Sequence, residues 1–370
     1  MGNAFNLGKV FGIQLRLHYT WFIIFILLTV SLVYPNWSRL PYWILGVITS
    51  LLFFASVLAH ELAHSLVGRA HGIPIRSITL FIFGGIAHMT KEATRPDAEL
   101  KMAIAGPICS LVIGGIFGSI WLFTRGINEP ITEMLGRLAL INVALAAFNL
   151  IPGFPLDGGR VFRSILWRVT GNYTHSTRIA TRVGRGVGYS FILGGIVIVF
   201  LTEQLISGLW LAFIGWFLEN AASASYRQLQ WQEAMQGLTA SQVMLTSYPT
   251  VSPNITLSEL VQHHVLPNGY TFFIVVDQGK LEGIVTLHNI RTVAKQNWDT
   301  SRINEIMTPA NRLRAASPEQ DVMSLLEQMS ESDINQMPVI SQDRVIGVIT
   351  RDNLLRLWRA RSELGLKSTH

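Results

Sequence analysis

Residues 57–66 read VLAHELAHSL and stand at the end of a long apolar segment. On a helix, His60 and His64 are one turn apart and project from the same face, with Glu61 on its flank. This H-E-x-x-H arrangement is typical of a zinc site, in which two imidazoles bind the metal and the glutamate moves the proton of a water molecule. The preceding segment, Pro41 to Ala59, has no charged residue and nearly crosses a bilayer as a helix. Ionisable groups there need partners or a polar cavity, which favours a metal site over histidines that only pack within a bundle.

Composition indicates a polytopic membrane protein with a modest soluble part. The chain has 370 residues, of which 49% are hydrophobic and 14% charged, and its mean hydropathy is positive. The net charge of +6 comes from basic residues spread over short loops rather than from one patch. Lipid headgroups explain this charge better than nucleic acid does, so we expect a lipid bilayer and no nucleic-acid partner.

The apolar segments predict about six transmembrane helices and a membrane-associated β segment. Residues Gly72 to Met89 are too short and too rich in β-branched and aromatic residues for a spanning helix, and they predict a strand or hairpin that lines a cavity. The expected spans are Tyr19 to Ser38, Pro41 to Arg69, Met102 to Thr124, Leu138 to Leu156, and two within Gly186 to Leu218 that turn near Glu203.

Lysine and arginine counts predict the topology. The N-terminus and the loops 69–101 and 160–185 together hold 13 of them, whereas the opposite side has only Arg39, Arg125 and Arg137. By the positive-inside rule, the chain is expected in the cell membrane as a multi-pass protein with both termini in the cytoplasm. The histidine end of the second span then faces the cytoplasm as well.

The composition becomes that of a soluble domain at about residue 222, where an internal repeat appears. Val243-Met244 is matched by Ile306-Met307, and the GIVT at residue 283 by the GVIT at residue 347. Each half reads as helix, strand, strand, helix. We therefore expect a membrane domain at 1–221 and a soluble α/β domain at 222–370, with repeats at about 240–297 and 303–361 that share one core.

A catalytic zinc site needs a third protein ligand. Asp157 is the leading candidate, because it follows a span broken by Pro152, Gly153 and Pro155 on the predicted face of His64. An alternative is that Asp157 only caps a helix at 158–169. The remaining candidates, in or near a loop, are His71, His88 and Glu99.

HELAH at 60–64, AIAGP at 103–107 and FNLIPGFPLDGGR at 148–160 together resemble the site-2 protease family of intramembrane zinc metalloproteases. The resemblance implies His60, His64 and Asp157 as ligands of one Zn²⁺ and Glu61 as the catalytic residue. It implies that Gly84, Gly85 and Asn149 contact the substrate. The implied reaction hydrolyses a peptide bond in or near the transmembrane segment of a single-span membrane protein, as in regulated intramembrane proteolysis.

The C-terminal repeat is similar to a tandem pair of CBS domains, many of which bind adenine nucleotides. Nucleotide-binding copies commonly have T-x-x-D after the second strand, whereas this chain has Thr286 with Asn289 and Thr350 with Asn353. Asparagine lacks the two strong acceptors of a carboxylate. These four residues are candidates for nucleotide binding, and a structural role or a homodimer through the CBS domains is the alternative.

A metal-ion transporter or channel regulated by CBS domains would also explain intramembrane charges beside a soluble repeat. It does not require the H-E-x-x-H order, and the membrane part shows no inverted repeat. A protease relic that only binds membrane proteins is disfavoured by the intact histidine, glutamate and aspartate positions.

Overall fold

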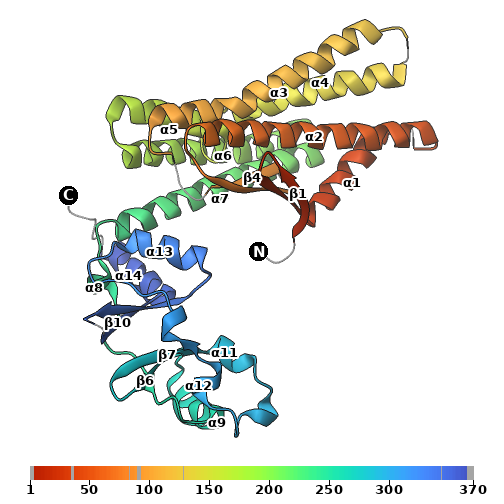
Figure 1. Cartoon of the computed structure of the whole chain (residues 1–370). Helices are drawn as coiled ribbons and strands as arrows, with labels where there is room; N and C mark the ends of the chain where they lie inside the picture. Colours follow the sequence, from red (N-terminus) through yellow and green to blue (C-terminus); the bar gives the residue numbers. More distant parts are fainter. Residues whose placement is uncertain are drawn as a thin grey trace. The chain divides into compact units, whose positions relative to one another are not determined.

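The structure is a computed structural model that describes residues 4–34, 37–82, 84–89, 93–127, 129–342 and 344–364. The chain divides into two compact units, Met1–Leu229 and Gln230–His370. Figure 1 shows that long helices dominate the first unit and that short helices and strands make up the second.

Among the described residues, seven helices belong wholly or largely to the first unit. In chain order they are α1 (Thr20–Val33), α2 (Leu40–Ala70), α3 (Pro96–Thr124), α4 (Glu129–Asn149), α5 (Asp157–Thr170), α6 (Tyr173–Thr202) and α7 (Leu205–Met235). Within the described part of the chain, five of them, α2, α3, α4, α6 and α7, have the length and apolar composition of membrane spans. The polytopic helical architecture expected from the sequence is therefore present.

Helix α1 is shorter than predicted. The sequence indicated a span from Tyr19 to Ser38, but the helix ends at Val33 and has 14 residues. Tyr34 adopts φ −60° and ψ 134°, as expected for a residue that precedes a proline. The six predicted spans thus correspond to five long helices and one shorter apolar helix.

A four-stranded sheet lies in the first unit and includes the predicted hairpin. Its strands are β1 (Ala4–Val10), β2 (Ile13–His18), β3 (Ile75–Phe81) and β4 (Gly84–Met89), in that spatial order. Strands β1 and β2 are antiparallel, β2 and β3 are parallel, and β3 and β4 are antiparallel. Among the described strands, β4 is therefore an edge strand, with a strand partner on one side only.

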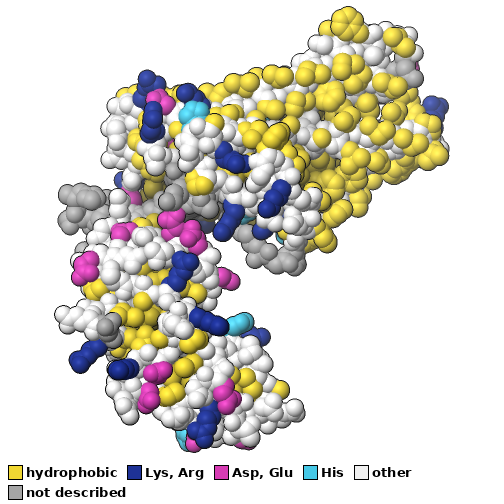
Figure 2. All heavy atoms as spheres, in the orientation of Figure 1, with side chains coloured by type: hydrophobic (Ala, Val, Ile, Leu, Met, Phe, Trp, Pro, Cys, Tyr) yellow, Lys and Arg dark blue, Asp and Glu magenta, His cyan; other side chains and the backbone are white. Residues whose placement is uncertain are grey.

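The surface of the helical unit is unusually apolar. Figure 2 shows hydrophobic side chains covering the region of α3 and α4. Phe123 and Phe200 are 84% and 80% exposed, as suits contact with lipid rather than water. Charged side chains are concentrated elsewhere on this face (Figure 2).

In its described residues, the second unit contains two small sheets and several short helices. Its strands are β5 (Thr250–Val251), β6 (Phe272–Asp277), β7 (Lys280–Thr286), β8 (Thr308–Pro309), β9 (Gln336–Ser341) and β10 (Arg344–Thr350). Its helices are α8 (Ala240–Val243), α9 (Leu257–Leu260), α10 (Leu266–Asn268), α11 (Leu287–Arg291), α12 (Ile303–Ile306), α13 (Val322–Glu331) and α14 (Arg351–Glu363). The strands are ordered β5-β6-β7-β8 in one sheet and pair as β9-β10 in the other.

The two halves of this unit exchange their leading segments. Val243 of the first half is buried with Val339 and Ile349 of the second. Ile303 of the second half is buried with Val275 of the first. Neither half completes its apolar core alone, which explains why the repeat occurs as a pair.

Candidate metal centre and cavity

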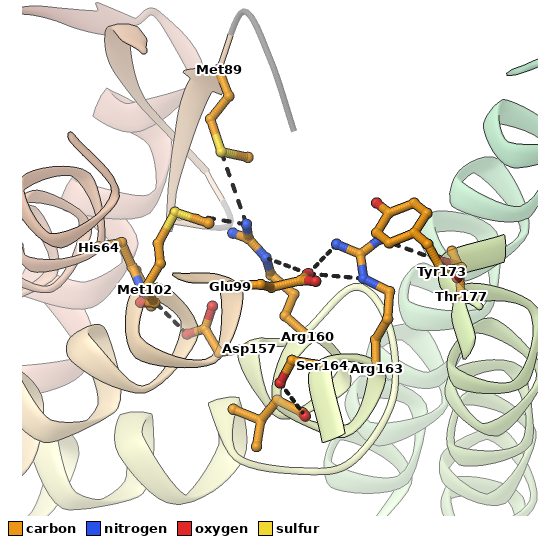
Figure 3. Close-up of polar contacts among 11 residues, drawn as sticks. His64, Met89, Glu99, Met102, Asp157, Arg160, Arg163, Ser164, Tyr173 and Thr177 are labelled. Carbon is orange, nitrogen blue, oxygen red and sulfur yellow. Dashed lines mark hydrogen bonds and ion pairs between the residues drawn. The ribbon is translucent and has the colours of Figure 1, made fainter. Parts of the chain in front are cut away.

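Three side chains distant in sequence converge inside the helical unit. His60 and His64 project from α2, and their Nε2 atoms are 3.1 Å apart. The Oδ2 atom of Asp157, from the start of α5, lies 3.1 Å from His60 Nε2 and 3.0 Å from His64 Nε2. Both histidines are buried, and Figure 3 shows Asp157 directed toward His64. In the described part of the chain, these three residues form the one group with metal-ligand spacing.

The break after α4 delivers Asp157 to the histidines. Helix α4 ends at Asn149, and α5 begins at Asp157 after a turn. Leu156 occupies the N-cap position of α5 and makes no side-chain capping bond. Asp157 is the first helical residue and its carboxylate contacts the rings, so the helix-cap alternative does not describe its contacts.

Helix α3 orients both rings. His60 Nδ1 lies 2.9 Å from Ser110 Oγ, and His64 Nδ1 lies 2.6 Å from the carbonyl oxygen of Met102. Gly106 stands between these positions, where a Cβ would overlap the Nε2 atoms of both rings. With Nδ1 engaged on each ring, Nε2 is the atom left to face Asp157. Ser110 and Gly106 were not predicted as site residues, although Met102, Gly106 and Ser110 follow one another at intervals of four and so share one helix face.

The three donors fit zinc. Catalytic zinc takes three protein ligands at about 2.0–2.2 Å, and tetrahedral ligands at that distance lie roughly 3.3 Å apart. The donor atoms here are separated by 3.0 to 3.1 Å. Two imidazoles and one carboxylate suit zinc, whereas calcium prefers six or more oxygen ligands.

The cluster opens into a cavity of about 730 Å³. Glu61 lines this cavity beside the histidines, and Gly84, Gly85 and Asn149 line it as well. Most of the other lining side chains are apolar; they include Phe53, Phe54, Phe148, Phe213 and Phe217. The structure thus brings Asn149 and the two glycines to the space in front of the cluster.

The alternative third ligands lie elsewhere. His71 Nδ1 bonds the carbonyl oxygen of Val67 at 2.8 Å, and His88 lies in β4 opposite Ser77. Glu99 is fully buried but binds Arg163, whose Nε donates to Glu99 Oε1 at 2.8 Å and whose Nη2 donates to the same oxygen. Figure 3 shows this ion pair separate from His64 and Asp157.

The CBS-like candidates are engaged in contacts between the repeats. Thr286 Oγ1 donates to Asn289 Oδ1 at 2.6 Å, and Asn289 Nδ2 donates to the carbonyl oxygen of Ile306 at 3.0 Å. In the other half, the backbone N–H of Asn353 donates to Thr350 Oγ1 at 3.1 Å. Asn353 Nδ2 donates to the carbonyl oxygen of Val243 at 2.9 Å. Each asparagine therefore ties its repeat to the leading segment of the other.

A cluster with metal-ligand spacing among helices of membrane-spanning length defines a class, the membrane-embedded metal-binding proteins. Comparisons with known proteins narrow it. Residues 48–129 and 124–193 match the model of Peptidase family M50, and residues 240–295 and 303–359 match that of the CBS domain.

Two relatives that match this chain over nearly its whole length are named zinc metalloproteases. The Synechocystis protein sll0528, provisionally named a zinc metalloprotease, is 34% identical over 96% of both chains. Zinc metalloprotease MJ0392 of Methanocaldococcus jannaschii is 30% identical over 96% of both chains. A solved site-2 protease from the same organism is 32% identical to this chain, with a TM-score of 0.44. The aligned region covers 60% of this chain and 95% of the solved one.

The chain belongs to Peptidase family M50, the site-2 protease family, and carries tandem CBS domains. It is a zinc metalloprotease and a multi-pass membrane protein, as the sequence predicted. The family membership favours the hydrolase over the metal-ion transporter.

Proposed function

We propose that this chain hydrolyses a peptide bond in or near the transmembrane segment of a single-span membrane protein, in regulated intramembrane proteolysis. His60, His64 and Asp157 would hold the zinc ion, and Glu61 is the catalytic residue. The observation that carries the proposal is the meeting of two Nε2 atoms and one Oδ2 atom within 3.1 Å, in a cavity that Glu61 also lines.

Zinc in such a site acidifies water and polarises a carbonyl group when bound. Glu61 takes the proton of the attacking water and returns it to the leaving amine nitrogen. Ser110 and the Met102 carbonyl hold the imidazoles in orientation during this transfer. The largely apolar lining lowers the local dielectric constant, which strengthens charge interactions in the cavity.

Strand β4 is the proposed receptor for the substrate. A transmembrane helix hides its carbonyl groups in backbone hydrogen bonds, so the segment to be cut must unwind. An unwound segment can pair with an edge strand, and β4 is an edge strand whose Gly84 and Gly85 line the cavity. Asn149 would contact the bound segment from the end of α4.

We propose residues 1–221 as the protease domain and residues 222–370 as its regulatory or dimerising module. The distribution of lysine and arginine supports a cytoplasmic location for both termini and for the CBS pair. Adenine-nucleotide binding at the CBS pair would use the side-chain amides of Asn289 and Asn353, whose Nδ2 atoms also donate to the carbonyl oxygens of Ile306 and Val243.

Replacing Glu61 tests the proposal. Cells that lack the native protein would express the wild type, Glu61→Gln or the control variant Glu133→Gln. Glu133 is a suitable control because it forms an exposed ion pair with Arg137. We expect zinc to be retained in all three proteins. Single-span membrane proteins should accumulate, and their soluble fragments disappear, only with Glu61→Gln. Identical membrane proteomes for wild type and Glu61→Gln, with zinc bound in both, would contradict the proposal.

A further inference from the structure

Arg160 is a cavity residue that the zinc chemistry does not use. It lies three residues after Asp157 on α5, so the two side chains share one helix face. Its side chain is 18% exposed and lines the cavity that contains Glu61. Among the described residues that line this cavity, Arg160 is the one lysine or arginine.

The contacts of the Arg160 guanidinium are long. Its Nη2 lies 3.9 Å from the Sδ atoms of Met89 and Met102, and its Nε lies 3.9 Å from Glu99 Oε1. A guanidinium has five N–H donors, and thioether sulfur is a weak acceptor. Within the described part of the chain, Arg160 therefore retains donor capacity beside the metal centre.

Glu99 does not need Arg160 as its principal partner. Arg163 donates from Nε and Nη2 to Glu99 Oε1, and its guanidinium also lies over the rings of Phe154 and Tyr173. Figure 3 shows the two arginines on different sides of Glu99, with Arg160 directed toward Met89. Met89 is the last residue of β4, so Arg160 extends from α5 toward the strand that is proposed to bind the substrate.

We propose that Arg160 is a substrate-binding residue whose guanidinium donates hydrogen bonds to a backbone carbonyl oxygen of the peptide lying along β4. This inference rests on the proposed function. An unwound peptide exposes carbonyl groups on both edges, and β4 can pair with only one edge. The other edge faces a mostly apolar cavity, where an unpaired carbonyl is costly. Arg160 lies beside the end of β4, with Nη2 3.9 Å from Met89 Sδ, and can supply donors to such a carbonyl group.

Two zinc-directed probes separate substrate binding from metal binding. Acetohydroxamate engages the metal alone, whereas a peptidyl hydroxamate with two leucine residues also presents backbone carbonyl groups. Dissociation constants for both would be measured on the purified full chain, as wild type, Arg160→Gln and Arg160→Lys. The control is Arg168→Gln. Arg168 lies on α5, like Arg160, and forms an exposed ion pair with Asp97.

We expect Arg160→Gln to bind the peptidyl hydroxamate about tenfold more weakly, the loss of one charge-assisted hydrogen bond. Arg160→Lys should lose less, and Arg168→Gln should match the wild type. Zinc content and acetohydroxamate affinity should stay unchanged in all variants.

Equal binding of the peptidyl probe by Arg160→Gln and Arg168→Gln would overturn the inference. A parallel loss of zinc and of both probes in Arg160→Gln would also overturn it, since Arg160 would then support the metal. Absence of zinc from the wild type would instead overturn the proposed function, and this inference with it.

Discussion

The side chain of Glu61 fills the space that a Cβ on Gly85 would occupy. The backbone of β4 thus approaches Glu61, the proposed catalytic residue, so closely that only glycine fits at position 85 without a shift. Gly85→Ala should push the Glu61 carboxyl group out of place and reduce cleavage by about tenfold or more, because small misplacements near the reacting atoms are costly. Zinc content should not change, since Gly85 does not contact the histidines in the way Gly106 does.

Gly115→Ala is the matched control for this substitution, because a Cβ on Gly115 meets no heavy atom within 4 Å. Cleavage rate and zinc content would be measured side by side for both variants. Full activity in Gly85→Ala would show that Glu61 works from another position than the one seen here.

Ser110→Ala removes the hydroxyl group next to His60 Nδ1. Loss of such a supporting contact typically weakens metal binding by about 10-fold to 100-fold. The control is Ser119→Ala on the same helix, whose hydroxyl bonds only the carbonyl oxygen of Gly115 among the described residues. Competition with a chromophoric chelator would measure both affinities. Equal zinc affinity in the two variants would remove Ser110 from the site.

The sequence predicted the parts of the site that depend on local periodicity. The helical spacing of His60 and His64 placed both rings on one face, and the Pro-Gly break before Asp157 indicated where the backbone would leave a helix. The helix, strand, strand, helix pattern of the repeat also follows from local composition, and the structure has these elements.

Other features depend on contacts between distant segments. Ser110 and the Met102 carbonyl acquire their roles only because α3 packs against α2. Strands β1 and β2 were not predicted, although Ile13, Leu15 and Leu17 alternate with polar residues. In the sequence, the basic residues of this region were used only to place the N-terminus in the cytoplasm. Pairing of β2 with β3, across more than 50 residues of sequence, decides the outcome.

Glu99→Gln should destabilise the helical unit. Removing one charged member of a buried ion pair typically costs about 3–5 kcal/mol, because burial makes each charge expensive without its counter-charge. Asp97→Asn breaks the exposed pair with Arg168 on the same two helices and should cost less than about 1 kcal/mol. Thermal unfolding in detergent would compare the two variants. Similar melting temperatures would indicate that the Glu99–Arg163 pair contributes little to stability.

Cysteine labelling tests the proposed orientation. Ile127, between α3 and α4, is 78% exposed, and Gln296 is exposed in the CBS pair. In a background where Cys109 is replaced by alanine, a membrane-impermeant thiol reagent applied to intact cells should label Ile127→Cys and spare Gln296→Cys. Lysis should make the second site reactive. Labelling of Gln296→Cys before lysis would show that the CBS pair faces the outside of the cell, contrary to the proposed topology.

Metal affinity of Asp157→Ala tests the central claim most directly. Asp97→Ala, a change at an exposed aspartate on α3, is the control, and zinc would be titrated into purified apo-protein against a chelator. The geometry predicts one tight zinc site per chain in the wild type, in Glu61→Gln and in Asp97→Ala, and a large loss of affinity in Asp157→Ala. Zinc binding by Asp157→Ala as tight as that of the wild type would contradict a site formed by His60, His64 and Asp157.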